Sequence, residues 1–332
     1  MQGAELAAAT AAAPSMAFAG PVGAPVVDAD WDAFDPWRML PLRHRLHEHP
    51  LLQLDRLVEF GERMQRASKV RAFSNAATAG SDFNAASREH PYSGDAAETL
   101  QRIADAHAWM LLGNIQTDDV YRDLVDLVLD EMDARIRPRD PGMFCRAGWI
   151  IVSSPRTVTP FHMDKGNGVL LHVMGDKTVY VWEPDDIDVA SEAARDRYHH
   201  HGSLDLLHWR EEYRERARVF RLKPGEGIYM PSTSPHMVET GNTPSITITL
   251  TYSTPRTRRN ALLHAANDVL RETGMAPFMV GRHPLFDDVA YAGLRTMLAA
   301  RDIGRRARGR PSAEYSGRYA LPAEPGDARL SR

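Results

Sequence analysis

The stretch that decides the fold is TPFHMDKGNGVLLHVMGDKTVYVWEP, residues 159–184. Its second part holds two short runs rich in Val, Leu, Thr and Tyr, residues 167–174 and 177–184, separated by Gly-Asp. Short β-branched and aromatic runs bounded by turn residues are typical of β-strands. We therefore expect two neighbouring strands here, entered through a polar segment that carries His162 and Asp164.

Runs of the same kind occur on both sides of this stretch, at residues 148–154, 218–225, 226–232 and 244–253. Many short strands joined by Gly, Pro, Asp and Ser indicate a sandwich or jelly roll. We assign residues 138–257 to this mainly β core. Residues 185–218 are polar and predicted to be a helical insertion between two strands.

The flanking regions are predicted to be helical. Apolar residues recur with a period of 3.6 in residues 51–64, 96–112 and 118–136, so that residues 28–137 are expected to form a helical region packed on the core. Residues 258–303 are expected to form C-terminal helices. Residues 1–27 and the basic tail 304–332 have few bulky apolar residues and are expected to stay disordered, and the start could be Met1 or Met16.

Composition limits the classes of function. The net charge is −4, which argues against a chain built as a whole to bind nucleic acid or an anionic membrane. The single cysteine, Cys145, cannot form an internal disulfide. No Lys or Arg precedes Arg38, as an export signal requires, and no apolar run spans a bilayer. We expect a cytoplasmic protein; the short Arg308–Pro311 motif, similar to the core of a DNA-binding AT hook, is better explained as part of a solubilising tail.

A metal site is the main functional hypothesis. His162 and Asp164 are two residues apart, and on an extended strand such residues point to the same face. His236 follows the run that ends at Pro231 and is the candidate third ligand. Two histidines and one carboxylate that leave other positions open are the ligands of non-haem Fe(II) oxygenases. An isolated His-x-Asp pair also occurs by chance, so the distal histidine carries much of the weight.

The order of residues from about 145 to 255 resembles the JmjC and cupin-like 2-oxoglutarate oxygenases, in particular the asparaginyl-hydroxylase type. The resemblance rests on the His-x-Asp pair, the Gly-Asp-Lys at 175–177, the Pro-Gly-Glu-Gly turn at 224–227 and His236. It implies a double-stranded β-helix core and an Fe(II)- and 2-oxoglutarate-dependent dioxygenase with His162, Asp164 and His236 as metal ligands and catalytic centre. Such an enzyme uses O₂, releases succinate and CO₂, and hydroxylates a protein side chain, an amino acid or a small metabolite.

The resemblance also implies a co-substrate pocket. By position, Thr159 and Lys177 would bind the distal carboxylate of 2-oxoglutarate; a turn lysine facing water is the alternative for Lys177. The family's asparagine near the other carboxylate is replaced by Gly168, so Asn167 or Thr249 is the candidate for that contact. Thr247, Thr249 and Thr251 alternate and would share one face, which also fits a structural threonine ladder.

Several alternatives remain open from the sequence. The protein could be a metal-binding cupin that serves as a sensor or interaction module without turnover, or a cupin enzyme that needs no 2-oxoglutarate. His199, His200 and His201 could bind metal or lie in a solvated loop. Related oxygenases dimerise through C-terminal helices, so a homodimer is a hypothesis, and the substrate is not identified by these residues.

Overall fold

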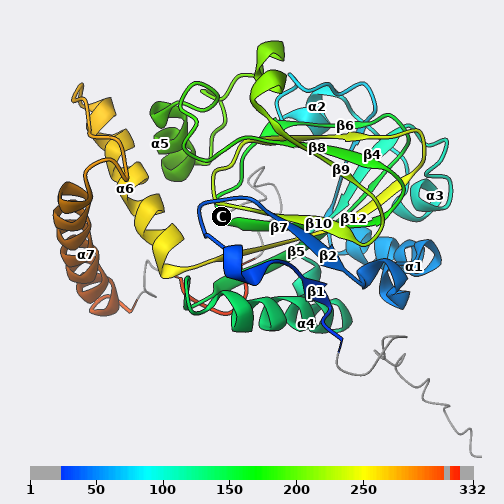
Figure 1. The fold of residues 1–332 in the computed structure, drawn as a ribbon, viewed down its shortest axis with the longest axis horizontal. Coiled ribbons are helices and arrows are strands. Elements are labelled where there is room, and N and C mark those ends of the chain that lie inside the picture. Colours follow the sequence, from blue (N-terminus) through cyan, green and yellow to red (C-terminus); the bar gives the residue numbers. More distant parts are fainter. Residues whose placement is uncertain (1–23, 310–314, 322–332) are drawn as a thin grey trace, which may run out of the picture.

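The computed structural model describes residues 24–309 and 315–321, and within these ranges the strands form two antiparallel sheets. The larger sheet has the order β1-β2-β10-β7-β12-β5-β4-β3, and the smaller sheet has the order β6-β11-β8-β9. Figure 1 shows the smaller sheet facing the larger one, as in a jelly roll. The strands are β1 Val27–Asp28, β2 Leu40–His44, β3 Val70–Ser74, β4 Ala108–Leu112, β5 Phe144–Ser153, β6 Val158–His162, β7 Asn167–Met174, β8 Lys177–Val181, β9 Arg218–Leu222, β10 Glu226–Met230, β11 His236–Thr240 and β12 Ser245–Ser253.

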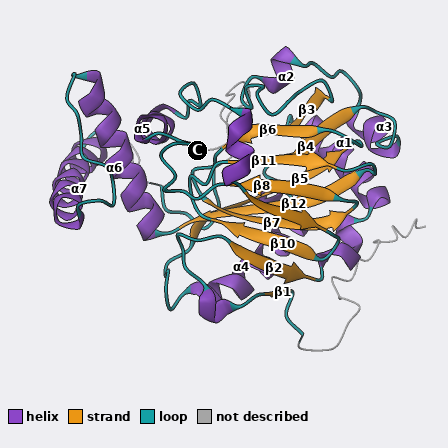
Figure 2. Cartoon of the chain, turned by 45° about the horizontal axis from the view of Figure 1, so that its top comes forward, coloured by secondary structure: helices purple, strands orange, loops and turns teal. Residues whose placement is uncertain are grey.

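Helices cover the outer face of the larger sheet and extend from its side. Figure 2 shows α4 beneath the strands, whereas α6 and α7 stand apart from the sheets. Asp118 caps α4 by accepting hydrogen bonds from the backbone N–H groups of Val120 and Tyr121, which satisfies two donors at the start of the helix. The helices are α1 Leu54–Arg66, α2 Ala86–Glu89, α3 Ala96–Gln101, α4 Asp119–Ile136, α5 Glu192–His201, α6 Pro255–Glu272 and α7 Pro284–Arg306.

The core between α4, α1 and the larger sheet explains why apolar residues recur with a period of 3.6 in the sequence of these helices. Leu124, Val128 and Met132 of α4 pack against Ile248 and Leu250 of β12, and all are fully buried. Burying each such side chain stabilises the fold by about 1.5–3 kcal/mol. The opposite face of the same strands is therefore turned toward the smaller sheet, where the polar alternation of β12 lies.

All the runs predicted to be strands are strands, but the helical prediction for residues 28–137 was partly wrong. Residues 96–112 were expected to form one helix; the chain instead forms α3 and then β4, a fully buried strand between β3 and β5. His107 has φ 53°, so the chain cannot continue as a right-handed helix there. A short run that is apolar on both faces fits a buried strand as well as a helix, and the period alone could not decide.

The predicted disordered ends need two corrections within the described residues. Val27 belongs to β1 and is 1% exposed, so the folded chain begins before residue 28. Residues 315–321 of the tail lie along β5, where Tyr319 forms a parallel bridge with Arg146. Residues 1–23, 310–314 and 322–332, and with them half of the Arg308–Pro311 motif, lie outside the described ranges. None of the helices in those ranges is long and apolar enough to cross a membrane.

Candidate metal centre and cavity

The two candidate histidine ligands are brought together by strand pairing. His162 is the last residue of β6 and His236 is the first residue of β11, and the antiparallel register places them directly opposite each other. Their ring centroids are 4.1 Å apart, and each residue is about 5% exposed. Residues that are 74 positions apart in the sequence thus form one site because the backbone hydrogen bonds of the smaller sheet fix their positions.

Both imidazoles are oriented by backbone carbonyl groups. Nδ1 of His162 lies 2.7 Å from the carbonyl oxygen of Pro160, and Nδ1 of His236 lies 3.1 Å from that of Ser234. A carbonyl only accepts, so both Nδ1 atoms carry hydrogen, and Nε2 is the nitrogen of each ring that is left to face a metal. Burial lowers the pKa of His162 well below its usual value, which keeps this ring neutral. Neutral rings with an open Nε2 are the form that coordinates a metal.

Asp164 supplies the carboxylate, although the local structure differs from the expected one. β6 ends at His162, so Asp164 lies in the turn beyond the strand rather than on its face. Its backbone oxygen accepts a hydrogen bond from the N–H of Thr233, which ties this turn to the loop before His236. Burial raises the pKa of Asp164, which favours a cation beside it.

The three side chains converge as the sequence predicted. One ligand atom from each of His162, Asp164 and His236 lies within 4.8 Å of the other two, and Asp164 Oδ2 is 3.8 Å from His236 Nε2. Metal bonds of about 2.1 Å place neighbouring ligands roughly 3 Å apart, so this pair needs to close by less than about 1 Å. The residues therefore fit a two-histidine, one-carboxylate metal centre.

A cavity opens beside this centre, between the two sheets. Its wall includes all three candidate ligands and three of the four predicted co-substrate residues, Thr159, Lys177 and Thr249. Thr247 and Thr251 also line it. The threonines of β12 share one face, as predicted from their alternation, and that face is turned into the cavity. A polar stripe inside an otherwise apolar wall is the usual means of orienting a small ligand.

Lys177 is the buried cation of the cavity. It is 4% exposed, and its Nζ donates a hydrogen bond of 2.7 Å to Thr247 Oγ1. Within the described ranges no carboxylate forms an ion pair with it, and burial lowers its pKa to about 7. A lysine so placed lacks the counter-charge that would offset its desolvation, which is what an anionic ligand would provide.

The remaining predicted residues fall into two groups. Thr159 Oγ1 accepts a hydrogen bond from Trp109 Nε1, and Thr249 Oγ1 is buried with no partner among the described residues. Asn167 does not line the cavity: its Oδ1 accepts a hydrogen bond from the N–H of Ser232, so it braces the loop that leads to His236. The placement supports Thr249 rather than Asn167 for a ligand contact.

His172 is a structural residue. Its Nδ1 lies 3.3 Å from Thr247 Oγ1 and its Nε2 lies 2.8 Å from the carbonyl oxygen of Gly175. Burial lowers its pKa to about 3, so the ring is neutral. Both ring nitrogens have partners, which supports a role in the core rather than in the cavity.

Three residues that the sequence did not single out complete the wall near the metal ligands. Phe83 stacks on His162 with centroids 3.8 Å apart, and the guanidinium of Arg71 lies over the Phe83 ring, 4.6 Å from its centroid. Trp109 of β4 stacks on Phe73 and positions Thr159. Trp109 was not identified as a site residue from the sequence, because its segment was assigned to a helix.

A family model described as a cupin-like domain matches residues 26–258, about 70% of the chain. The chain therefore belongs to the cupin-like domain family, which confirms the family expected from the metal motif and its spacing. The match begins at residue 26, in agreement with the early start of β1.

Comparisons with solved structures find partial likenesses at low identity. YcfD, a ribosomal oxygenase from Escherichia coli in complex with cobalt and 2-oxoglutarate, is 14% identical, with 87% of this chain and 71% of that chain covered and a TM-score of 0.44. The DMSP lyase DddQ from Ruegeria pomeroyi DSS-3 is 16% identical, with 32% and 38% covered and a TM-score of 0.21. The chain thus spans between 38% and 71% of these two structures. No curated protein matches the sequence.

Proposed function

We propose that the protein is an Fe(II)- and 2-oxoglutarate-dependent oxygenase that hydroxylates a protein side chain, an amino acid or a small metabolite. The observation that carries the proposal is the pairing of two sites in one cavity. A two-histidine, one-carboxylate centre lies at one part of the wall. The buried Lys177, which has no carboxylate partner in the described part of the chain, lies at the start of β8, four residues before Val181, the partner of His236.

The charges of the cavity suit a dianionic acid. A divalent metal with Asp164 leaves one positive charge, and Lys177 and Arg71 add cations to the same wall. Burial lowers the pKa of Arg71 to about 10, so it remains charged at neutral pH. One carboxylate of 2-oxoglutarate would bind at the metal, and the other would pair with Lys177 and the hydroxyl group of Thr159 or Thr249. Each carboxylate of the co-substrate would then have a cationic partner.

The bound iron and co-substrate would supply the oxidising chemistry, in which 2-oxoglutarate is converted to succinate and CO₂ as O₂ is consumed. The chain contributes the ligand geometry and the exclusion of water. Pro160 and Ser234 hold the two imidazoles in the coordinating tautomer, and Phe83 covers one face of His162. Tyr198 of the insertion also lines the cavity, so the segment between β8 and β9 is placed to contact the substrate.

Lys177 discriminates between the alternatives. A cupin enzyme that needs no 2-oxoglutarate has no use for an unpaired buried lysine in the cavity, and the stability cost of that lysine argues against it. A sensor without turnover could still bind 2-oxoglutarate, so only turnover excludes it. The test therefore measures both binding and product.

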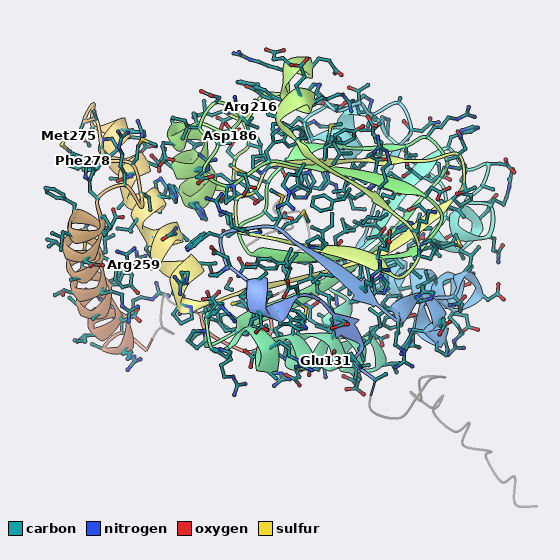
Figure 3. The ribbon with its side chains drawn as sticks, viewed as in Figure 1. Glu131, Asp186, Arg216, Arg259, Met275 and Phe278 are labelled. Atoms are coloured by element: carbon teal, nitrogen blue, oxygen red, sulfur yellow. The ribbon has the colours of Figure 1, made fainter. Side chains whose placement is uncertain are left out.

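We also infer a homodimer through α6, α7 and the segment between them. Figure 3 shows Met275 and Phe278 at the outer end of this helical pair, and they are 53% and 58% exposed. Leu285 and Val289 on α7 are 82% and 75% exposed. Apolar side chains this exposed on neighbouring segments are typical of an association surface.

The experiment is a turnover assay of the purified protein with Fe(II), O₂ and 2-oxoglutarate, in which succinate is measured. We expect succinate above background in the wild type and none with His162→Ala. Mass spectrometry of candidate substrates would then distinguish hydroxylation from demethylation. Binding of 2-oxoglutarate without succinate, under all substrates tested, would favour the sensor; no binding of 2-oxoglutarate would overturn the proposal.

A further inference from the structure

A second group of metal-ligating side chains lies where the insertion meets the C-terminal helices. α5 and α6 pack side by side, away from the sheets (Figure 1). The last two residues of α5, His200 and His201, face Asp268 and Glu272, which are one turn apart on α6. This group is made from residues outside the cavity and has no part in the function proposed above.

The donor atoms of the group are close together. His200 Nδ1 lies 2.8 Å from Asp268 Oδ2, and His201 Nε2 lies 3.2 Å from the same oxygen and 3.2 Å from Glu272 Oε1. All four ligand atoms lie within 4.8 Å of one another. The Asp268 side chain is 2% exposed, whereas the two histidines and Glu272 are 31–43% exposed, so the group is anchored in the protein and open to solvent on one side.

We propose that His200, His201, Asp268 and Glu272 form a second metal site that takes Zn²⁺ in a closed, four-ligand arrangement. Zinc bonds of about 2.0–2.1 Å place tetrahedral ligands roughly 3.3 Å apart. The three measured separations are 2.8, 3.2 and 3.2 Å, so a small expansion would admit the ion. Two imidazoles with two carboxylates suit zinc, and no position is left open for a substrate.

Hydrogen bonds within this group do not give every close imidazole–carboxylate contact a donor hydrogen. His201 Nε2 carries one hydrogen at most, yet it is equally distant from two carboxylate oxygens. A single N–H cannot point at both, so one contact between an imidazole and a carboxylate remains without a good hydrogen bond. A metal at the centre would accept a lone pair from each of the four atoms.

A bound zinc ion would lie beside the positively charged Arg197, which contacts two of the proposed ligand residues. Its Nε lies 3.3 Å from Asp268 Oδ1, and its Nη1 lies 3.7 Å from Glu272 Oε1. The donors proposed for zinc are Asp268 Oδ2 and Glu272 Oε1, so Arg197 keeps its shorter contact and loses only the longer one. With neutral imidazoles the two carboxylates and Arg197 sum to one negative charge, so a divalent cation would bring the group to a net charge of +1.

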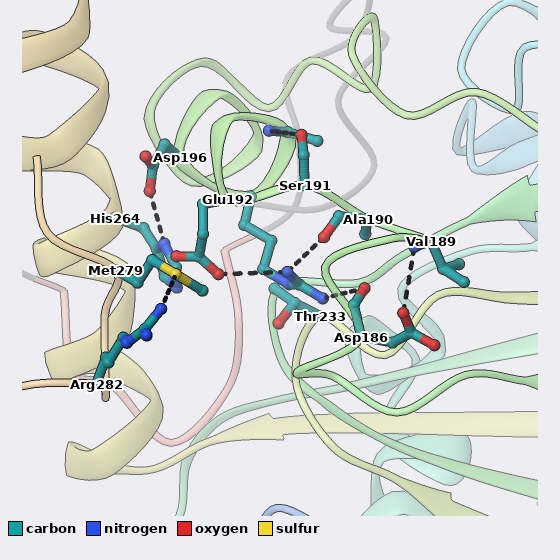
Figure 4. A network of polar contacts seen from close by, with 12 residues as sticks. Asp186, Val189, Ala190, Ser191, Glu192, Asp196, Thr233, His264, Met279 and Arg282 are labelled. Carbon is teal, nitrogen blue, oxygen red and sulfur yellow. Dashed lines mark hydrogen bonds and ion pairs between the residues drawn. The ribbon is translucent and has the colours of Figure 1, made fainter. Parts of the chain in front are cut away.

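A neighbouring cluster between α5 and α6 differs from the proposed zinc site. Glu192 and Asp196 of α5 face His264 of α6 (Figure 4). There Asp196 Oδ1 lies 2.7 Å from His264 Nδ1, and Asp196 Oδ2 accepts a 2.7 Å bond from Arg271 Nε. Each oxygen of Asp196 has its own donor at 2.7 Å, so this carboxylate is already paired, and we confine the zinc site to the end of α5.

The proposed ion would join the insertion to the C-terminal helices. α5 also carries Tyr198, which lines the cavity, two residues before the first proposed ligand. A metal link at the end of α5 would hold this helix against α6 and so fix one part of the cavity wall. The site would thus be structural, and its loss would change the position of the insertion rather than the chemistry.

The test is zinc stoichiometry of the full-length protein, freed of metal with a chelator and then titrated with Zn²⁺ by calorimetry. The double variant His162→Ala, Asp164→Ala removes the first site, so that any remaining zinc belongs to the second. In this background we expect one Zn²⁺ per chain. Adding His201→Ala should weaken binding by at least about tenfold, since changes in the surroundings of a metal already cost 10–100-fold. His208→Ala, an exposed histidine of the same insertion, should leave it unchanged.

Circular dichroism of the metal-free variants would show that they fold, and Glu272→Gln provides a second variant of nearly the same shape. Titration with Co²⁺ should give the intense visible bands of a four-coordinate ion in the background variant. The proposal is overturned if that variant binds no Zn²⁺, or if His201→Ala and Glu272→Gln bind it as tightly as their parent. Neither result depends on succinate formation, so the oxygenase proposal is judged separately.

Discussion

Replacing Lys177 by methionine should make the protein more stable and, at the same time, weaken its binding of 2-oxoglutarate. Methionine has a similar length and no charge. Lys177 is buried, hydrogen-bonded only to Thr247 among the described residues, and has no carboxylate partner there. We expect a residue of this kind to be retained for its ligand and not for the fold.

The stability change follows from the pKa. At 1.36 kcal/mol per pKa unit, lowering the pKa of Lys177 from 10.5 to about 7 makes the folded state roughly 4–5 kcal/mol less stable at pH 7 and below. The unfolded lysine stays protonated up to pH 10.5, so this cost falls as the pH rises and is about 2 kcal/mol at pH 9. Losing the hydrogen bond to Thr247 offsets about 1 kcal/mol. The net gain for Lys177→Met should be about 3 kcal/mol at pH 7 and about 1 kcal/mol at pH 9.

The binding change has the opposite sign. Removing the cation would leave a desolvated carboxylate of 2-oxoglutarate unpaired, which costs about 2–5 kcal/mol, or a dissociation constant at least about 30-fold higher. The assay combines urea unfolding of the metal-free protein at pH 7 and pH 9 with calorimetric titration of 2-oxoglutarate. Lys223→Met, a change at an exposed turn lysine, is the control for both. A variant that is less stable than wild type, or whose affinity stays within threefold, would refute the reasoning.

Three further outcomes test other parts of the structure. In the wild type, the affinity for 2-oxoglutarate should fall by up to about tenfold per pH unit above pH 7, because the free Lys177 must take up a proton to pair with the dianion. The affinity of Lys177→Met should not change with pH in this range. A wild-type affinity that is independent of pH would contradict this prediction. Thr249→Val removes a buried hydroxyl without a partner among the described residues, so it should stabilise the metal-free protein by about 1 kcal/mol and weaken 2-oxoglutarate binding about tenfold; unchanged affinity would remove Thr249 from the pocket. Leu285→Glu with Val289→Glu should convert a dimer to a monomer in light scattering, and a wild type that is already monomeric at micromolar concentration would exclude the interface.

The parts of the fold that the sequence predicted are those with a local signal. Residues 167–174 and 245–253 are apolar or alternate and end at turn residues, and they form β7 and β12 with nearly the expected bounds. β4 was not predicted as a strand, because Trp109 and its neighbours are buried on both faces and the alternation of apolar and polar residues that identifies a strand is missing. Its place between β3 and β5 is set by long-range pairing, which no local pattern encodes.

The same distinction holds in the site. His162, Asp164 and His236 were found because metal coordination restricts the residue type and spacing. Phe83 was not, because an aromatic residue in a loop has many ordinary roles, and its contact with His162 depends on how the chain returns to the sheet. Asn167 had the right residue type near the right position, but its amide is turned to the loop at Ser232.

The metal centre depends on apolar residues that never touch the metal. Phe161 and Met163 flank His162 in the chain, and Met237 follows His236; all three are buried in one cluster with Trp182. Because side chains alternate along a strand, burying these neighbours in that cluster turns the two imidazoles to the opposite face, toward the cavity. A slip of β11 by one residue would place Met237 opposite His162 and move His236 into the apolar cluster. The loss of about 1.5–3 kcal/mol for each displaced large side chain opposes that slip, so the register that forms the metal site is selected by packing on the far side of the sheet.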